Sequence, residues 1–250
     1  MLYLAHSYLL LMRELFQVVL TQPMFNAFVG LYNLIPDVGV VILIITVLIK
    51  VVLYPLTASS IKSQKALTDL QPKLDAIKKE CKGDKQKLAQ ETMKLYKENK
   101  VNPMASCLPM LIQLPILIAL YYVLQRGLTA TNFDTLYSFI KSPGQINTIS
   151  VGLVDLKNSN IIIAVLAGAA QFWQAKMMMR KKAPKEAGEG AKDENMMSMM
   201  NKQMLYMMPV MTVFIGWQLP GGLTLYWLLS TLLMVAQQAI LFKKKAIKQV

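Results

Sequence analysis

Long runs without a charged residue limit this chain to folds that a lipid bilayer allows. The longest run covers 40 residues, from Gln203 to Phe242, and a second covers 25 residues, from Val101 to Gln125. One membrane-spanning helix needs about 20 apolar residues, and helices are the spanning structures that runs of this length form. Charged residues make up 16% of the chain, against about a quarter in soluble domains. The sequence therefore predicts an all-α integral membrane protein.

Five spans account for these runs. The run of 40 residues is about twice what one span needs, and Pro220-Gly221-Gly222 near its middle predicts a turn between two antiparallel helices. Apolar residues at helical spacing and a Gly83-Asp84 turn predict a helical hairpin outside the membrane. The predicted segments are an interfacial amphipathic helix with its lead-in (1–34), a first span (35–58), a cytoplasmic helical hairpin (59–102), a second span (103–125), an extracytoplasmic connection (126–157), a third span (158–178), a cytoplasmic loop (179–202), a fourth span (203–219), a fifth span (222–242) and a basic cytoplasmic tail (243–250).

The first residues of the chain carry a narrow polar stripe. Arg13, Glu14, Gln17 and Thr21 fall on one side of a helix that otherwise consists of Leu, Val and Phe. This pattern predicts an amphipathic helix that lies in the membrane interface. A degenerate first transmembrane segment is the alternative for the same residues.

Basic residues gather in three regions. Of 27 Lys and Arg residues, 22 lie in 57–104, in 176–202 or after Phe242. This is the positive-inside pattern, which predicts that these regions and the C-terminus are cytoplasmic. Anionic lipids are the expected partners of these charges, with ribosomal RNA as the alternative and no specific nucleic-acid target. The lack of a transit peptide favours a multi-pass protein of a bacterial plasma (inner) membrane.

The sequence offers little for catalysis. His6 is the sole histidine, and Cys81 and Cys107 lack the paired spacing of a metal or disulfide site. No glycine-rich phosphate-binding loop is present. We therefore expect no catalytic residue, no metal and no cofactor, and a protein that is not an enzyme.

Lys50 is the one charged residue between Val38 and Ile61. A charge near mid-bilayer costs from about 3 to more than 10 kcal/mol, and such residues usually face the protein interior or a water-filled cavity. No Asp or Glu lies in the apolar core of any predicted span, which disfavours a proton-coupled transporter. Snorkelling of the long side chain to the interface is the alternative. We expect Lys50 to attract negative groups that come from outside the protein.

Several motifs, taken in order, resemble the YidC family of membrane protein insertases. The quoted motifs are IKVVLYPLT at Ile49–Thr57, LQPK at Leu70–Lys73, KENKVNP at Lys97–Pro103, LIQLPI at Leu111–Ile116, LPGGLTLYW at Leu219–Trp227 and the pair Gln237-Gln238. Each motif alone is weak, but together they cover about residues 15 to 243 in the right order. The resemblance is therefore specific.

The resemblance implies five core helices around a hydrophilic groove that is open to the cytoplasm and to lipid and closed on the outside. Lys50 matches the groove cation, where many members carry Arg, and Thr46 and Trp227 match groove or substrate-contact positions. Gln174 matches a polar groove position with its register uncertain by one residue. Gln113 is a further polar residue within a span that we assign to the groove.

The resemblance also implies that the cytoplasmic hairpin recruits substrates, with Lys73, Lys78, Lys79, Lys82 and Lys85 as its candidate residues. The expected function is an insertase and chaperone that passes nascent single- or few-span proteins through the groove into the bilayer without nucleotide hydrolysis. Its expected partners are nascent membrane proteins, with the ribosome and the Sec translocon as candidates. A small anion-selective channel or transporter that uses Lys50 as its selectivity charge is the alternative. A purely structural membrane scaffold is the third hypothesis.

Overall fold

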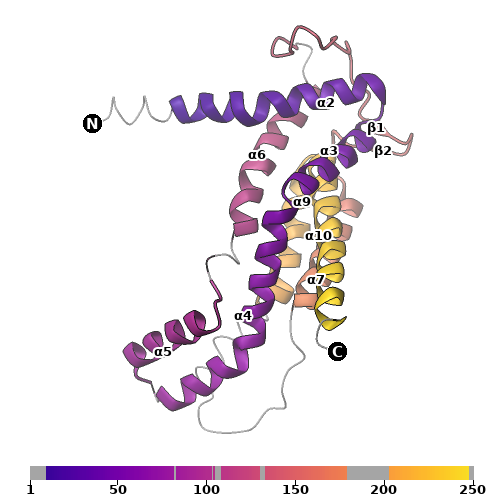
Figure 1. Ribbon diagram of the computed structural model, residues 1–250. Coiled ribbons are helices and arrows are strands. Elements are labelled where there is room, and N and C mark those ends of the chain that lie inside the picture. The colour runs from indigo at the N-terminus through magenta and orange to yellow at the C-terminus, as the bar shows by residue number, and fades with distance from the viewer. Residues whose placement is uncertain are drawn as a thin grey trace. The chain divides into compact units, whose positions relative to one another are not determined.

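The computed structural model is all-α, as the sequence predicts, apart from one short β-hairpin (Figure 1). It describes residues 10–81, 83–102, 104, 108–129, 133–178 and 203–247. The predicted cytoplasmic loop 179–202 lies outside these residues. The elements are the π-helix η1 (Gln17–Thr21), α2 (Gln22–Leu34), α3 (Val38–Val52), α4 (Tyr54–Cys81), α5 (Lys85–Glu98), α6 (Leu108–Thr129), β1 (Ile149–Ser150), β2 (Val154–Asp155), α7 (Ile161–Met178), the π-helix η3 (Gln203–Met207), α9 (Met208–Gln218) and α10 (Gly221–Ile247).

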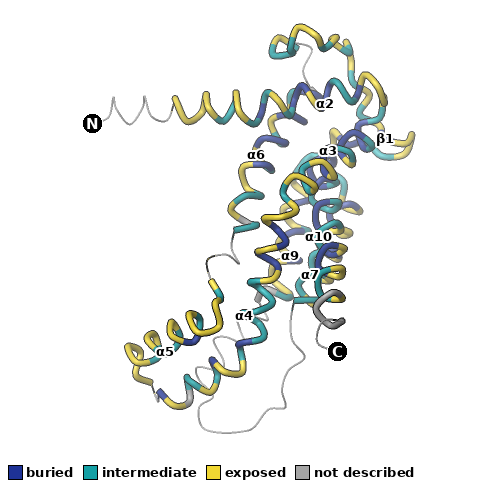
Figure 2. Tube along the Cα trace, viewed as in Figure 1, coloured by how far each residue is buried: buried dark blue, intermediate teal, exposed yellow. Residues whose placement is uncertain are grey.

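The chain divides into two compact units. The first contains Met1–Val51, Leu111–Ala167 and Val213–Ser230, and the second contains Val52–Met110, Gly168–Thr212 and Thr231–Val250. The core of the first unit consists of large side chains that are almost completely buried: Phe25, Phe28, Ile42, Leu120, Leu124, Leu156, Leu223 and Tyr226. Figure 2 shows this burial along α2, α6 and α10.

Four helical segments in the described part of the chain are long and apolar enough to span a membrane. They are Leu10–Leu34, Leu111–Leu128, Ile161–Met178 and Gly221–Lys243. The helical segments Val38–Val52 and Tyr54–Lys78, in α3 and α4, pass the same test together but are bent by 69° at the break, as in a broken span or a re-entrant loop. A multi-span all-α protein is therefore confirmed.

The number of spans and the position of the first helix stay predictions. The predicted fourth span contains a shorter apolar helix, Leu205–Gln218, whereas Leu10–Leu34 qualifies as a span by length and composition. This segment lies within the predicted interfacial helix and its lead-in (1–34).

The break at Leu53 follows from Pro55. Proline has no amide hydrogen to donate and disfavours the helical conformation in the residue before it, so a helix cannot run through it unperturbed. Proline is well accommodated in a first helical turn, and α4 begins at Tyr54. The predicted boundary between the first span and the hairpin, at 58/59, therefore lies inside α4.

Helix α2 is attached by a buried amide to the connection between α6 and α7, which was predicted as extracytoplasmic. Asn26, which is 2% exposed, donates from Nδ2 to the Thr135 carbonyl at 3.1 Å and accepts at Oδ1 from the Tyr137 amide at 2.7 Å. The Tyr32 hydroxyl accepts from the Asn147 amide at 2.8 Å. Because buried polar groups are stable only when they are hydrogen-bonded, these contacts fix α2 to the connection.

Asp37 fastens the start of α3 to the β-hairpin. Its carboxylate accepts from the Ser150 hydroxyl at 2.7 Å, from the Val151 amide at 2.6 Å and from the Val40 amide at 3.0 Å. Val151 has φ = 52°, a left-handed conformation that is unfavourable for a β-branched residue. The charge-assisted bond to its amide helps to hold the chain in this conformation.

The start of α10 is bound to the same connection. The amides of Gly221 and Gly222 donate to the carbonyls of Asn158 and Leu156, at 2.9 and 2.8 Å. A Cβ atom at Gly221 would lie 2.8 Å from the Asn158 carbonyl oxygen, which is too close for any other residue. The connection therefore satisfies amides that the first turn of a helix leaves without a partner.

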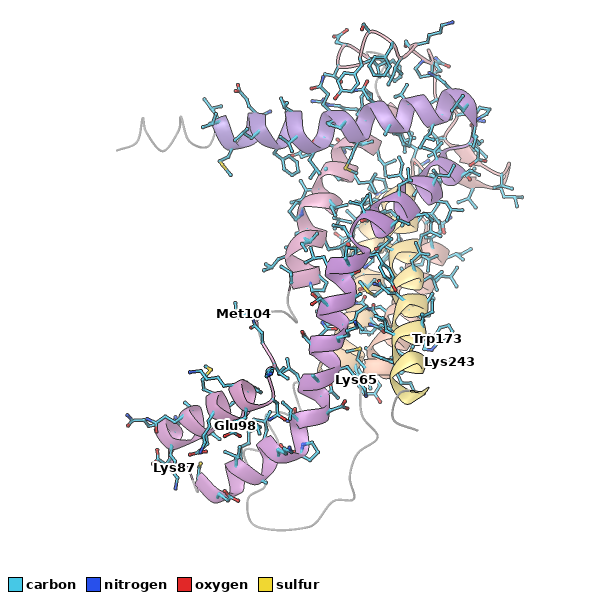
Figure 3. All side chains as sticks on the ribbon, in the orientation of Figure 1. Lys65, Lys87, Glu98, Met104, Trp173 and Lys243 are labelled. Carbon is cyan, nitrogen blue, oxygen red and sulfur yellow. The ribbon has the colours of Figure 1, made fainter. Side chains whose placement is uncertain are left out.

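The second unit contains the helical hairpin, which is formed by the C-terminal part of α4 and by α5 (Figure 3). The predicted turn is confirmed: Gly83 has φ = 91°, and the Asp84 carboxylate caps α5 by accepting from the amides of Gln86 and Lys87 at 3.0 Å. The buried residues of the hairpin are Leu70, Leu74, Cys81 and Leu95.

We expect Asp37→Asn to destabilise the protein. Burial alone would raise the pKa of the Asp37 carboxyl, but the hydrogen bonds from Ser150 and Val151 lower it below its ordinary value of 3.8. A depressed pKa means that the stabilisation is present above about pH 4 and is lost as the pH falls through the folded-state pKa. Thermal unfolding in nanodiscs at pH 7 should show a loss of about 1–3 kcal/mol.

At pH 3 the difference between the Asp37→Asn variant and the parent chain should be smaller than at pH 7. The control is Glu98→Gln, an exposed carboxylate on α5, which should unfold like the parent. A deficit of the same size at both pH values would contradict the role of the Asp37 charge.

Candidate functional site

Lys50 lies in the last turn of α3, a helix of 15 residues in which it is the only charged one. Its side chain is half-buried, and among the residues that the structure describes it has neither a carboxylate nor a hydrogen-bond partner. Polar groups removed from water are normally paired, and an intramembrane cation normally faces the protein interior or water. Lys50 is thus a charge without a partner in the described part of the chain.

Thr46 lies one turn before Lys50 and is fully buried. Its hydroxyl donates to the Ile42 carbonyl at 2.6 Å. This bond within α3 is the usual way in which a threonine in a helix satisfies its hydroxyl. The groove assignment of Thr46 stays a prediction, and the side chain is not exposed in this structure.

Gln113 and Tyr226 connect α6 to α10 in the first unit. The Gln113 Nε2 atom donates to the Tyr226 hydroxyl at 2.8 Å, and the Tyr226 hydroxyl also bonds to the side chain of Ser230. Tyr226 is completely buried, and the adjacent Trp227 is half-buried. Of the predicted groove residues, Gln113 and Trp227 are therefore close along this part of α10.

The amide of Gln174 is half-buried on α7, in the second unit. It has no hydrogen-bond partner within the described ranges. Gln171, one turn earlier, instead accepts a hydrogen bond from the Thr212 hydroxyl on α9. The predicted register at α7 stays open, because the structure pairs Gln171 and leaves Gln174 unpaired.

A second polar cluster lies between α4 and α10 in the second unit. The Gln237 Nε2 atom lies 3.0 Å from the Thr57 hydroxyl and 3.3 Å from the Tyr54 carbonyl. Gln238 is 1% exposed, and its Oε1 atom has no partner among the described residues. Tyr54, Thr57, Gln237 and Gln238 belong to the motifs that resemble the YidC family, but no role was predicted for them. Two adjacent amides in an apolar run were the signal that could have identified them.

The five predicted recruitment lysines belong to the hairpin. Lys73 and Lys85 are exposed and Lys78 is half-buried. The side chain of Lys79 and the whole of Lys82 lie outside the described part of the chain. The exposed lysines give the hairpin a solvated, basic surface, and their role in recruitment stays a prediction.

The described residues contain no group of three or more His, Cys, Asp or Glu side chains that could hold a metal ion. What the site offers is one cation in α3, together with hydrogen-bonding amides, hydroxyls and a phenol within apolar helices. These groups can hydrate or hydrogen-bond a polar chain that passes through an apolar environment. They do not form the nucleophile and base pair of covalent catalysis.

We expect the Gln113–Tyr226 bond to contribute to stability as a pair. A double-mutant cycle with Gln113→Leu and Tyr226→Phe should give a coupling of about 0.6 to 1.7 kcal/mol, the range for hydrogen bonds between membrane helices. The measurement is unfolding in mixed micelles followed by near-UV circular dichroism.

The matched control for this cycle is the exposed pair on α6 in which Gln125 donates to the Tyr121 hydroxyl at 2.9 Å. The same substitutions there should show little coupling. If the effects of Gln113→Leu and Tyr226→Phe on the free energy of unfolding simply added, the hydrogen bond between the two side chains would not contribute to stability.

Comparisons with known proteins agree with this architecture. A family model described as "60Kd inner membrane protein" matches residues 30–249. The membrane protein insertase YidC of Fusobacterium nucleatum is 39% identical over 208 residues, which cover 83% of this chain and 87% of that protein. The YidC of Clostridium tetani is 36% identical over 208 residues, 82% of this chain and 81% of that protein.

A crystal structure of an active YidC insertase with its first transmembrane domain resolved matches with a TM-score of 0.52 and 27% identity. The match covers 82% of this chain and 42% of that one. Together with the apolar helices, these matches support a multi-pass protein of a bacterial inner membrane. The chain belongs to the YidC family of membrane protein insertases.

Proposed function

We propose that this chain inserts nascent single- or few-span proteins into the bilayer through a hydrophilic groove that contains Lys50. Relatives that cover most of the chain are insertases by name. The observation that carries the proposal is the unpaired, half-buried Lys50 in an apolar helix. A cation that no residue of the described chain neutralises is available to a partner that arrives transiently.

The barrier to insertion is the transfer of a polar flank across an apolar slab. Each peptide or hydroxyl group that loses its water without a replacement costs about 2–7 kcal/mol, depending on the reference state. A groove that contains water and side-chain amides replaces part of this hydration. Gln113, in the same unit as Lys50, is the predicted groove residue that supplies such an amide.

Lys50 adds attraction for acidic residues in the translocated flank. Charges interact more strongly near an apolar slab than in bulk water. The lysine ammonium lacks the planar fork of arginine, so it attracts carboxylates without imposing two-point geometry. This property suits a site that must release each chain after a brief contact.

Release into lipid supplies the driving force. When the apolar part of the substrate leaves sideways, each buried CH₂ group contributes about 0.8 kcal/mol. A span of about 20 apolar residues therefore gains enough without coupling to nucleotide hydrolysis. The absence of a phosphate-binding loop from the sequence agrees with this.

The hairpin is the proposed recruitment element. Its exposed lysines lie on α4 and α5, in the second unit, and one helix of the hairpin continues from the broken span. Long-range attraction by basic residues speeds encounter with acidic partners and weakens as salt rises. Ribosomes and the Sec translocon remain candidate partners of this surface.

The direct test is charge reversal at position 50. We expect Lys50→Glu to reduce insertion of a single-span protein with an acidic translocated tail by about tenfold, which corresponds to about 1.4 kcal/mol in the barrier. Lys50→Arg should insert the same protein normally. The measurement is protease protection of the translocated tail in proteoliposomes without nucleotide.

The matched control is Lys157→Glu, at an exposed lysine that lies outside both the apolar run and the hairpin. This control variant should insert the substrate with the acidic tail, and a second substrate with an uncharged tail, as well as the parent chain does. A substrate with an uncharged tail should depend less on Lys50 than the acidic one. Normal insertion of the acidic substrate by Lys50→Glu would contradict the role of the charge. A steady Lys50-dependent anion current in planar bilayers would favour the channel alternative.

A further inference from the structure

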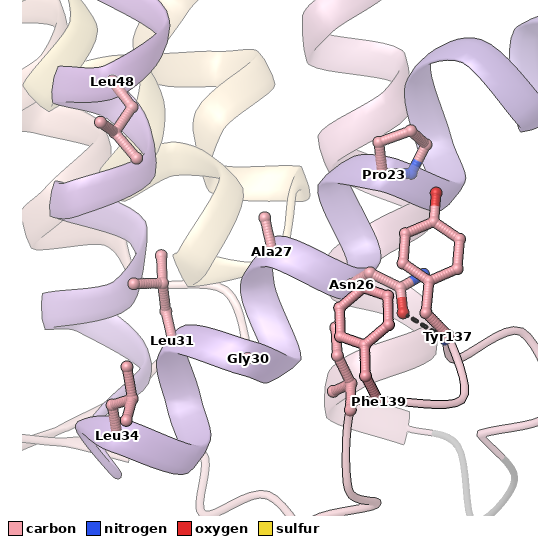
Figure 4. A pocket seen from close by; sticks show the side chains of 10 residues that line it. Pro23, Asn26, Ala27, Gly30, Leu31, Leu34, Leu48, Tyr137 and Phe139 are labelled. Carbon is pink, nitrogen blue, oxygen red and sulfur yellow. Dashed lines mark hydrogen bonds between the residues drawn. The ribbon is translucent and has the colours of Figure 1, made fainter.

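An open apolar cleft lies in the first unit (Figure 4). Its volume is about 530 Å³, within the range of about 300–1,000 Å³ that is typical of ligand sites. One wall is α2, which contributes Ala27, Gly30 and Leu34, and the opposite wall is the connection, which contributes Tyr137 and Phe139.

The cleft wall offers no free amide. Asn26 lines it, but its Nδ2 atom donates to the carbonyls of Gln22 and Thr135, and its Oδ1 atom accepts from the Tyr137 amide. A water molecule in a cavity needs two to four polar partners, which this wall does not provide. The cleft therefore suits an apolar occupant.

The apolar side chains at the rim are strongly exposed. Leu34 is 78%, Leu48 is 54% and Phe139 is 80% exposed. Leu34 and Leu48 belong to apolar helices, α2 and α3, which are candidate membrane spans or parts of one. The rim of the cleft thus consists of exposed apolar side chains on helices that are apolar enough to lie in a membrane.

The backbone of Lys141 is held at one end of the cleft. The Asn33 side chain donates to the Lys141 carbonyl at 2.8 Å, while Asn26 holds Tyr137. The segment from 137 to 141 therefore follows α2 over seven residues, about 10 Å, and brings Lys141 to the level of Leu34. The Lys141 ammonium is exposed and has no partner among the described residues.

We propose that this cleft holds one acyl chain of an anionic phospholipid, whose phosphate meets Lys141. The apolar wall fits the chain, and the charge at its end fits the headgroup. A helix about 10 Å wide would fill this volume with little more than one turn, so a protein segment fits less well than a lipid chain. The proposal is independent of insertase activity, because it requires no substrate.

The test uses purified full-length protein in nanodiscs that contain phosphatidylglycerol with a photoreactive diazirine in one acyl chain. After illumination, peptide mapping by mass spectrometry locates the adducts. We expect adducts in 23–34 and 137–140, and at least about fivefold fewer of them when Ala27→Trp fills the cleft. The matched control is Val18→Trp, at a position in the same helical segment that is 60% exposed and does not line the cleft.

A second variant that fills the cleft shows whether the loss of labelling comes from the filled cleft or from misfolding of the Ala27→Trp protein. Gly30→Leu also fills the cleft, because a Cβ atom there would meet the nearest side chain, Ile140, at an ordinary 3.8 Å. Both variants should lower the labelling. The proposal would be overturned if neither variant lowered the number of adducts in the cleft, or if adducts formed on exposed apolar surface throughout the protein.

The headgroup is tested separately. A phosphatidylglycerol probe should label the cleft more than a phosphatidylcholine probe, and Lys141→Gln should remove this preference. Lys157→Gln, an exposed lysine of the same connection outside the cleft, should retain it. A preference that survives Lys141→Gln would contradict the headgroup assignment. Displacement of the lipid by a substrate helix or by a second copy of the chain would overturn the choice of occupant.

Discussion

Hydrogen-bond satisfaction inside apolar surroundings is the constraint on which this structure depends. Asn26 and Tyr226 are almost completely removed from solvent, and each has partners for its polar atoms. An unpaired buried amide or hydroxyl would cost about 1–3 kcal/mol in a protein. Lys50 departs from this rule in the described part of the chain, and that departure is why we assign function to it.

The connection between α6 and α7 satisfies polar groups in the interior of α2 and at the start of α3 and of α10. It bonds to Asn26 in α2, to Asp37 at the start of α3 and to the first amides of α10. These bonds come from short turns and a two-stranded hairpin, which contain little apolar core of their own. Loss of the single charge at Asp37 should therefore lower the stability of the first unit.

The sequence was sufficient to predict the helical class, most apolar spans and the turn at Gly83-Asp84, because hydropathy and turn residues act locally. Pro55 indicates a break in the helix near Leu53. The break was not predicted, because the apolar run continues beyond Pro55. The Gln113–Tyr226 bond joins residues 113 positions apart. No local pattern specifies such a pair, and the same holds for the contact between Asn26 and the connection.

The candidate site was predicted in part for the same reason. A lone lysine in an apolar run is visible in any sequence, and Lys50 was found in this way. The burial of Thr46 and the pairing of Gln171 with Thr212 depend on how helices pack. The polar cluster around Gln237 was visible only as a motif until Thr57 and Tyr54 were placed beside it.

The proposal is that a passing polypeptide enters the groove that contains Lys50 and contacts Trp227 there. Its most direct test is site-specific photocrosslinking from position 227 during translation of a short membrane protein. The control is position 217, a tryptophan on α9 that is 55% exposed. We expect adducts between the nascent chain and position 227, and few adducts from position 217. Equal adducts from both positions, or none from position 227, would contradict it.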